Sequence, residues 1–278
     1  MSLASPASSA LSVSPGAAPA ALLSLEGIDL SFRGVQAINN LSFSVAAGEI
    51  CGLIGPNGAG KSSLLNVISG VYVPQRGQIH FDGRAIGRMN PRGAAQAGIA
   101  RTFQNIALFK GMSVIDNVMT GRHLFRLGGF WGDLLRTRRA VAEEGAARSA
   151  AEDVLALLGI QRYRATPVGR LPYGLQKRVE LGRALAARPK LLLLDEPMAG
   201  MTHDEKADMA RFIREAHQHL GSTVVLIEHD IGFVMNLSHH VVVLNYGRKI
   251  ADGTPAEVIV DSEVIAAYLG RAHKEGIG

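Results

Sequence analysis

The segment from residue 49 to residue 70 constrains the fold of this chain more than any other part of its sequence. It opens with the apolar run Ile50–Ile54, continues as Gly-Pro-Asn-Gly-Ala-Gly-Lys-Ser, and ends in apolar residues that recur with a helical period. A strand, a turn of the form G-x-x-x-x-G-K-[ST] and a helix, in this order, are typical of a loop that binds phosphate groups. Glycine has no Cβ, so the backbone can approach a phosphate closely, and the N–H groups at a helix start attract anions. The sequence therefore predicts a nucleotide site between residues 55 and 63.

Individual residues of this loop have distinct predicted roles. Lys61 supplies a mobile positive charge for the β- and γ-phosphates, and the Ser62 hydroxyl is a candidate ligand of Mg²⁺. We therefore expect the chain to bind ATP together with Mg²⁺. The loop residues expected to contact the nucleotide are Gly55, Asn57, Gly58, Gly60, Lys61, Ser62 and Ser63.

Composition narrows the class of protein. The 278 residues are enough for one large domain or two small ones, and 29 Lys and Arg against 24 Asp and Glu make the chain only mildly basic, which selects no class of partner. Cys51 is the single cysteine, so an intrachain disulfide is excluded. No stretch approaches the ~18 consecutive apolar residues of a membrane-spanning helix. Residues 1–21, rich in Ala, Ser and Pro, are expected to form a disordered tail, and the body is expected to work in a reducing compartment that contains ATP.

Alternating segments near the start of the chain predict a small antiparallel sheet beside the phosphate loop. Residues 23–32 and 37–45 alternate apolar and polar side chains, as half-buried strands do. Residues 78–81 predict a further strand, and Asp82-Gly83 is a hairpin signal.

Apolar runs later in the chain predict a parallel core sheet. The runs within residues 190–195 and 222–228 are typical of strands that are buried on both faces. Residues 99–103 predict another core strand, and a last hairpin is expected around Gly247.

The region between these core strands is predicted to be helical. Ser113 is placed to cap a helix that begins at Val114. Further helices are expected at residues 137–158, 174–188 and 203–220, and two short ones at 255–270. We therefore expect an α/β fold, in which a P-loop NTPase core of the ABC type carries a small antiparallel β subdomain and an inserted helical subdomain at about residues 105–185. The nucleotide-binding domain is expected to span residues 22–270, with a C-terminal tail at 271–278.

Four polar residues stand at the ends of predicted core strands. Because nucleotide sites of such sheets lie at the carboxyl ends of the strands, Gln104, Asp195, Glu196 and His229 are candidate site residues. Asp195 is placed to hold Mg²⁺, and Glu196 to orient or deprotonate a water molecule. His229 could hydrogen-bond the γ-phosphate, and Gln104 could sense both the metal and the water. Read alone, the acidic pair could instead cap the next helix, and the other two could be ordinary surface residues.

Five segments of the chain together resemble the nucleotide-binding subunits of ABC transporters. They correspond to the Walker A, Q-loop, signature, Walker B and His-switch segments of that family. In chain order they read GPNGAGKSS, RTFQN, LPYGLQKRVELGRAL, LLLLDEP and LIEHD. The resemblance covers residues 22–270. Two further segments, FKGMSVIDNVMTGRH and EVIAAYLG, are similar to the ATP-binding subunits of branched-chain amino-acid importers.

The resemblance implies how such a chain works. Subunits of this family form head-to-tail dimers with two ATP molecules at the interface, and Gly174 in the signature segment would contact the ATP of the opposite subunit. Phe32 matches the aromatic position that stacks on adenine, although a strand aromatic can also face the core. The helical insertion near Gln104 would dock on a membrane partner.

Partners and place are likewise implied by the resemblance. We expect two membrane-spanning permease subunits, a second ATP-binding subunit that is either different or a second copy, and indirectly an extracytoplasmic solute-binding protein. Nucleic acid is not expected as a partner. The chain would lie on the cytoplasmic face of the inner membrane as a peripheral subunit.

Two departures from the family pattern suggest a heteromeric dimer. Pro172 stands where the signature segment usually has Ser, and Leu175 where it usually has Gln. Thr202 stands near the position of an Asn or Asp that bridges the two ATP sites. All three changes fall where the chain would serve the opposite nucleotide, so we expect a dimer with unequal sites and a different partner subunit.

The sequence thus predicts an ATP-hydrolysing motor subunit of an importer for branched-chain amino acids or similar small polar solutes. The catalytic residues would be Lys61, Gln104, Glu196 and His229, and Mg²⁺ would be held by Ser62, Gln104 and Asp195. Related urea-import or lipopolysaccharide-export ATPases remain alternatives, as does a soluble ABC-type ATP-gated clamp. A small-molecule kinase would share the phosphate loop, but the sequence has no acceptor-binding motif.

Overall fold

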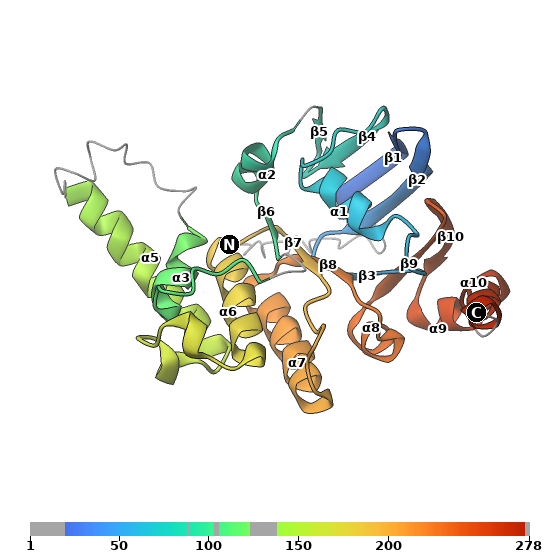
Figure 1. The fold of residues 1–278 in the computed structure, drawn as a ribbon. Helices are drawn as coiled ribbons and strands as arrows, with labels where there is room; N and C mark the ends of the chain where they lie inside the picture. Colours follow the sequence, from blue (N-terminus) through green and yellow to red (C-terminus); the bar gives the residue numbers. More distant parts are fainter. Residues whose placement is uncertain (1–19, 88, 103–105, 123–137, 276–278) are drawn as a thin grey trace, which may run out of the picture.

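The computed structural model describes residues 20–87, 89–102, 106–122 and 138–275, and its elements are arranged around a central six-stranded sheet (Figure 1). The sheet has the strand order β10-β9-β3-β8-β7-β6. Its strands are β3 (Ile50–Ile54), β6 (Ile99–Arg101), β7 (Leu191–Asp195), β8 (Thr223–Ile227), β9 (His240–Asn245) and β10 (Arg248–Gly253). All neighbouring pairs are parallel except the hairpin of β9 and β10. This arrangement confirms the predicted α/β class.

A second, antiparallel sheet has the order β2-β1-β4-β5 and lies above the central sheet in Figure 1. Its strands are β1 (Ala21–Phe32), β2 (Val35–Ala46), β4 (Arg76–Phe81) and β5 (Arg84–Ile86). The alternation of buried and exposed residues along β2 is the physical basis of the sequence prediction, because one face packs on the core and the other faces outward. The small antiparallel sheet and the hairpin at Asp82-Gly83 were both predicted.

The helices between β6 and β7 form the inserted helical region, which lies to the left in Figure 1. They are α3 (Val114–Thr120), α5 (Arg138–Leu157), the 3-10 helices η2 (Gln161–Tyr163) and η3 (Val168–Arg170), and α6 (Tyr173–Ala186). Ser113 caps α3 as predicted, since its side chain accepts a hydrogen bond from the Asp116 N–H. The helix expected to reach residue 188 ends at Ala186, because Arg188 adopts a left-handed conformation with φ 48°.

The remaining helices follow individual strands. They are α1 (Lys61–Ile68), α2 (Pro91–Ala97), α7 (His203–Leu220), α8 (Ile231–Leu237), α9 (Pro255–Ile259) and α10 (Ser262–Glu275). The sequence analysis did not predict α2 or α8. The last helix continues to Glu275, beyond the expected end at residue 270, because an internal Gly such as Gly270 costs only about 1 kcal/mol in a helix.

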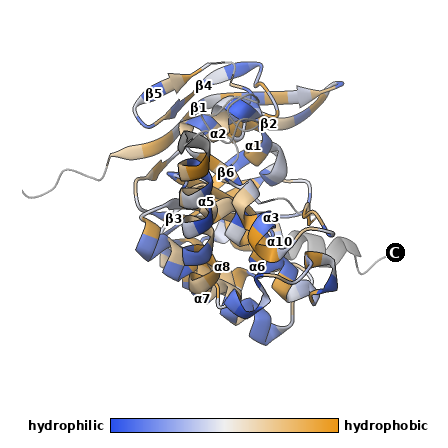
Figure 2. Ribbon diagram, turned by 90° about the vertical axis from the view of Figure 1, so that its left-hand side faces the viewer, coloured by the Kyte–Doolittle hydropathy of each residue, from blue (hydrophilic) through white to orange (hydrophobic). Residues whose placement is uncertain are grey.

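Both faces of the central sheet are covered, which explains its apolar strands. Along β7, Leu192 and Leu194 pack with the helical region, whereas Leu191 and Leu193 pack with the small sheet and α1. Successive side chains of a strand point to opposite faces, so a strand between two layers must be apolar throughout. Hydrophobic residues concentrate in these inner strands, while the outer helices mix both kinds of residue (Figure 2). Among the described residues, no helix is long and apolar enough to cross a membrane.

The topology brings three strand ends to one edge of the sheet. In the register of the central strands, Leu53 of β3 and Asp195 of β7 both lie beside Ile227 of β8. The phosphate loop that follows β3 therefore adjoins the polar residues that follow β7 and β8. This edge positions the candidate site.

Candidate functional site

The phosphate loop has the backbone shape that its glycines permit. Gly58 and Gly60 have φ values of 78° and 102°, in the left-handed region that other residues rarely adopt. A Cβ on Gly60 would lie 2.5 Å from the Ala37 carbonyl oxygen of β2. A Cβ on Gly55 would lie 2.1 Å from the Leu244 carbonyl oxygen. At Gly55 and Gly60, the loop therefore lies against neighbouring backbone that leaves no room for a side chain.

Lys61 lies folded over this loop at the start of α1. Its Nζ donates hydrogen bonds to the carbonyl oxygens of Gly55, at 2.6 Å, and Pro56, at 3.1 Å. The side chain is buried, with an exposed fraction of 6%. Asn57, Gly58 and Ser62 are exposed around it. The predicted phosphate-binding residues thus surround one buried cation.

Among the α-helices whose N-caps the structure describes, two present N-termini that no side chain caps. Asn90, Ser113, Thr202, Asp230 and Thr254 cap α2, α3, α7, α8 and α9 respectively. In contrast, α1 begins after Gly60 and α6 begins after Pro172, and neither residue makes a side-chain cap hydrogen bond. The first N–H groups of a helix lack intrahelical partners, and anions satisfy them well. Both uncapped helices begin in segments that the sequence analysis assigned to ATP.

Asp195 ends β7 in a buried ion pair that the sequence did not reveal. Its Oδ2 accepts a hydrogen bond from Nη2 of Arg101 at 2.8 Å, and Arg101 also donates to Asn66 and to Ser69 of the segment after α1. The Asp195 Oδ1 is buried and has no hydrogen-bond partner among the described residues. A buried carboxylate oxygen is costly without a donor or a cation, so this atom fits a metal ion or a water molecule bound to one.

Glu196 and His229 meet across the ends of β7 and β8. The His229 Nε2 and the Glu196 Oε1 are 2.7 Å apart. Glu196 has φ 49°, an uncommon conformation for a residue with a Cβ, and its N–H donates to the Ile227 carbonyl oxygen at 3.0 Å. Unusual backbone conformations of this kind cluster at functional sites. The structure thus brings together two residues that lie 33 positions apart and were predicted separately.

Glu228, which the sequence analysis did not select, is buried beside this pair. Its Oε1 accepts a hydrogen bond from the Met198 N–H at 2.7 Å, and its Oε2 from the His229 N–H at 3.2 Å. Burial raises the pKa of the Glu228 carboxyl, and these two hydrogen bonds act in the opposite direction. In the sequence, the only feature that could have pointed to Glu228 was its position as a carboxylate at the end of an apolar run.

Phe32, at the end of β1, is exposed to 41% and does not face the core. Its ring meets that of Tyr72 edge-on, with centroids 4.9 Å apart and an interplanar angle of 67°. An aromatic ring held by a neighbour and open on one side is suited to stack on a base. Gln104, the remaining predicted residue of the chain's own site, lies outside the described residues.

The start of α6 is packed closely on the start of α7. A Cβ on Gly174 would lie 2.3 Å from the Glu205 Oε1, and a Cβ on Gly200 would lie 3.2 Å from the Tyr173 ring. Glu205 belongs to the capping box that Thr202 forms at the start of α7. Tyr173 itself is 45% exposed. Gly174 therefore adjoins the loop that leaves Glu196.

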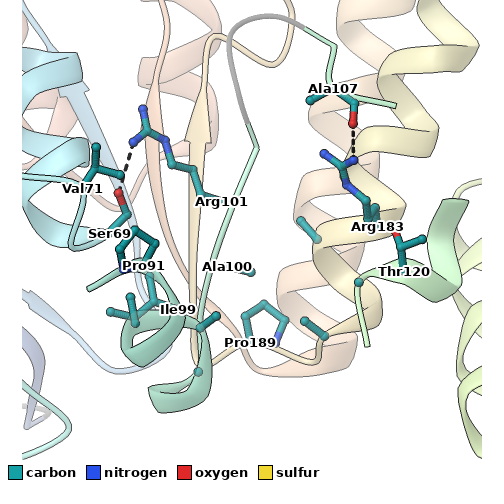
Figure 3. A pocket seen from close by; sticks show the side chains of 16 residues that line it. Ser69, Val71, Pro91, Ile99, Ala100, Arg101, Ala107, Thr120, Arg183 and Pro189 are labelled. Carbon is teal, nitrogen blue, oxygen red and sulfur yellow. Dashed lines mark hydrogen bonds between the residues drawn. The ribbon is translucent and has the colours of Figure 1, made fainter. Parts of the chain in front are cut away.

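A groove of about 390 Å³ separates the core from the helical region (Figure 3). Arg101 of β6 stands on one side, and Arg183 of α6 stands on the other, where it donates a hydrogen bond to the Ala107 carbonyl oxygen. Burial lowers the pKa of the Arg183 guanidinium. The lining between the two arginines is mostly apolar, with Ala94, Ala95, Ile99, Ala100, Ala184, Ala187 and Pro189.

The C-terminal helix also reaches the phosphate loop. Tyr268 of α10 packs against the apolar cluster that contains Ile54, and its hydroxyl interacts with the Gly55 backbone N–H. Burial raises the pKa of the Tyr268 hydroxyl. The C-terminal region thus supports the first residue of the loop.

Comparison with known proteins agrees with this geometry. Residues 38–199 match the family described as ABC transporter, and residues 248–274 match the family described as branched-chain amino acid ATP-binding cassette transporter. The high-affinity branched-chain amino acid transport ATP-binding protein BraF of Pseudomonas aeruginosa is 36% identical over 251 residues, which cover 90% of this chain and 98% of the relative. The high-affinity branched-chain amino acid transport ATP-binding protein LivG of Escherichia coli is 37% identical over 254 residues, which cover 90% of this chain and 98% of LivG.

Solved structures show the same similarity. A nucleotide-free ATP-binding cassette from an ABC transporter matches with a TM-score of 0.77 and 30% identity, covering 90% of this chain and 99% of the other. An ATP-binding cassette in its ADP conformation matches with a TM-score of 0.78, 31% identity and the same coverage. The phosphate loop, the strand-end residues and these similarities lead to one conclusion: the chain belongs to the ABC transporter family, as one of its nucleotide-binding ATPase subunits.

Proposed function

We propose that this chain is the ATP-hydrolysing motor subunit of an importer for branched-chain amino acids or similar small polar solutes. The Glu196–His229 contact beside the phosphate loop is the observation that carries the hydrolytic part of this proposal. The solute class is supported by the described functions of BraF and LivG and by the match of residues 248–274.

The phosphates of ATP would replace backbone carbonyl oxygens of the loop as hydrogen-bond acceptors of Lys61. Lys61 holds the carbonyl oxygens of Gly55 and Pro56, which are neutral acceptors. Phosphate oxygens are charged acceptors and form hydrogen bonds roughly twice as strong. Lys61 would therefore exchange carbonyls for the β- and γ-phosphates, while the uncapped N–H groups of α1 bind the same phosphates and Phe32 stacks on adenine.

Mg²⁺ fits the residues that surround the phosphate position. Ser62 would bind the ion, and Asp195, whose Oδ1 is buried without a partner, would hold it directly or through water, together with Gln104. When bound, the ion neutralises charge on the β- and γ-phosphates.

Hydrolysis would depend on the pair at the strand ends. Glu196 would orient and polarise the attacking water, because its carboxylate lies beside the phosphate loop in a fixed backbone conformation. The His229 Nε2, which lies 2.7 Å from the Glu196 Oε1 before ATP binds, would donate its hydrogen bond to the γ-phosphate when ATP is present. Positioning and preorganised charge then supply most of the rate enhancement.

The start of α6 would serve the ATP of a second subunit in a head-to-tail dimer. Its N–H groups have no side-chain cap, so they are available to a phosphate of the opposite site. Pro172 offers no hydroxyl there, and Thr202 is engaged in the cap of α7. The site completed by this chain's α6 would therefore be the weaker of two, which favours a different subunit as partner.

The groove between Arg101 and Arg183 would receive a cytoplasmic segment of a permease subunit. It is mostly apolar, it borders both the core and the helical region, and one wall carries Asp195's partner Arg101 (Figure 3). A segment seated there would sense movements between the two regions. The chain would then act at the cytoplasmic face of the membrane with two permease subunits, and a solute-binding protein would join from the other side.

A pull-down of the tagged full chain from native membranes tests this assignment. We expect two membrane-spanning subunits and a second, different ATP-binding subunit to co-purify, and ATP hydrolysis to rise when they are present. Recovery of the chain alone, or with proteins of DNA repair, would contradict the transport assignment while leaving the ATPase chemistry intact. Uptake of radiolabelled leucine by vesicles that contain the complex tests the solute class.

A further inference from the structure

Glu228 is a carboxylate in a buried position, at the end of a strand whose residues are almost all apolar. It directly follows β8, whose five residues are all buried, and it is itself only 5% exposed. Burying a carboxylate is costly unless hydrogen bonds compensate it. Burial accordingly raises the pKa of the Glu228 carboxyl. Its hydrogen bonds indicate what it does.

Within the described part of the chain, the Glu228 carboxylate accepts two hydrogen bonds, both from backbone N–H groups of the catalytic edge, that is, the strand ends that carry Glu196 and His229. The Met198 N–H donates to Oε1 at 2.7 Å, and the His229 N–H donates to Oε2 at 3.2 Å. One carboxylate thus joins the segment that follows β8 to the loop 197–202 that follows β7. Met198 is fully buried, so its N–H would have no access to water if this acceptor were lost.

The loop 197–202 connects two functional regions of the molecule. At its beginning, the Ala199 N–H donates to the Glu196 carbonyl oxygen at 3.2 Å, beside the unusual φ of Glu196. At its end, Gly200 lies against the Tyr173 ring, and the cap formed by Thr202 and Glu205 adjoins Gly174. Anchoring this loop at Met198, near its beginning, therefore fixes both the Glu196 backbone and, through the rest of the loop, the surroundings of the α6 N-terminus.

We propose that Glu228 is a positioning residue, which anchors loop 197–202 at Met198 and so holds Glu196 and His229 in place relative to each other and to the start of α6. This inference rests on the proposed roles of Glu196 and His229. Glu228 itself would touch neither ATP nor the attacking water. Its loss should slow the chemical step and leave nucleotide binding at the phosphate loop unchanged.

Three substitutions separate positioning from simple stability. Glu228→Leu removes the acceptor and leaves the buried Met198 N–H unpaired, and we expect kcat for ATP to fall by about tenfold or more. Glu228→Gln keeps a side-chain oxygen for the Met198 N–H and should stay within about threefold of the wild type. Glu228→Asp keeps the charge but shortens the side chain, so it should lie between the two and serves if the Leu variant does not fold.

The full chain is used for every measurement, with kcat and KM for ATP, the Kd of ADP and the melting temperature determined in parallel. Glu257→Ala is the matched control, because the Glu257 carboxylate also accepts a backbone N–H, that of Thr254 at 2.7 Å, at the start of α9. The Kd of ADP should stay within about twofold in all variants. The control should keep the wild-type kcat.

Three results would overturn the proposal. They are an unchanged kcat in a folded Glu228→Leu protein, an equal loss of kcat in the Gln and Leu variants, and a loss of ADP affinity that parallels the loss of kcat. Glu196→Gln measured alongside keeps this distinct from the proposed function. If that variant hydrolyses ATP normally, the catalytic assignment fails, whereas an inactive Glu196→Gln beside a fully active Glu228→Leu contradicts only the role of Glu228.

Discussion

The edge of the sheet that would serve the chain's own ATP and the start of α6 that would serve the opposite ATP are built in different ways. At the sheet edge, polar side chains contact one another: Arg101 pairs with Asp195, and His229 hydrogen-bonds Glu196. At the start of α6, the helix N–H groups have no side-chain cap, because Pro172 has no polar side chain and Gly174 has no side chain at all, and Tyr173 is exposed between them.

This difference concerns how much of each site is organised before ATP arrives. A network of side chains costs little reorganisation when the substrate binds, and such preorganisation is the main source of electrostatic catalysis. A bare helix N-terminus can bind a phosphate but has no group to orient water. On the proposed assignment, the chain would therefore carry the chemistry at its own site and supply mainly binding to the opposite one.

The largest expected effect comes from Glu196. Glu196→Gln keeps the size of the side chain and removes the carboxylate charge that would polarise water, so kcat for ATP should fall by about 100-fold or more. ATP binding should persist, because Lys61 and the α1 N-terminus are untouched. Steady-state hydrolysis and equilibrium binding of ATP measure the two effects separately.

A control for this prediction is Glu215→Gln. Glu215 is a partly exposed residue of α7 that pairs with Arg211 at 3.1 Å, away from the strand ends. It should hydrolyse ATP at the wild-type rate. If Glu196→Gln retained substantial hydrolysis, the catalytic edge would have to be assigned to other residues.

Lys61 should have the next largest effect, and on a different quantity. Lys61→Ala removes the cation that would contact two phosphates, so we expect the Kd of ATP to rise by roughly 10- to 100-fold. Isothermal titration with ATP measures this. Lys190→Ala is the matched control, since Lys190 pairs with Asp82 in the exposed turn between β4 and β5. If the Kd of ATP rose equally in both variants, the net positive charge of the protein, and not the phosphate loop, would govern ATP binding.

Local sequence patterns predicted the elements that carry the chemistry well, for a physical reason. The phosphate loop, β7 and α7 have strong local signals: required glycines, a continuous apolar run, and an amphipathic period with a capping residue. The short α2 has only an Asn cap and Pro91, and its apolar residues are mostly alanine, so its period is weak. The helix α8 follows His229 and was overlooked although Asp230 caps it.

Contacts between strands were beyond the sequence analysis. The Arg101–Asp195 pair exists because β6 lies next to β7, and the Glu228–Met198 hydrogen bond exists because β7 lies next to β8. Strand order is a property of the whole sheet, and no local pattern encodes it. The sequence could therefore identify Asp195, Glu196 and His229 but not the residues that hold them.

A smaller effect is expected at the start of α6. Pro172→Ser introduces a hydroxyl where the chain would meet the opposite γ-phosphate, and one new hydrogen bond should raise the ATPase rate of a dimer of this chain alone by about three- to tenfold. Pro167→Ser, at the start of η3, is the matched control for losing a proline. An unchanged rate in Pro172→Ser would mean that the backbone N–H groups suffice, and the two sites would then be equivalent.

The smallest effect should come from a charged cluster at the far end of β3, outside both regions. His240 lies between the carboxylates of Asp252 and Glu49, with Lys249 bound to Asp252 on the other side. Hydrogen bonds to Asp252, Cys51 and Glu49 raise the pKa of His240 to about 12, from an ordinary 6.5. Its stabilising contribution is therefore complete below pH 6.5 and is lost progressively as the pH rises toward 12.

His240→Gln should lower the free energy of unfolding by about 0.5 kcal/mol at pH 6, because the cluster is partly exposed and screened by solvent. The difference between wild type and variant should shrink at pH 9.5, because the unfolded chain has then lost the His240 proton, and taking it up on folding costs more as the pH rises. Urea denaturation at the two pH values measures this, and kcat at pH 7.5 should not change. A difference that grew with pH would contradict the charged state of His240, and a loss of kcat would mean that the far end of β3 communicates with the catalytic edge.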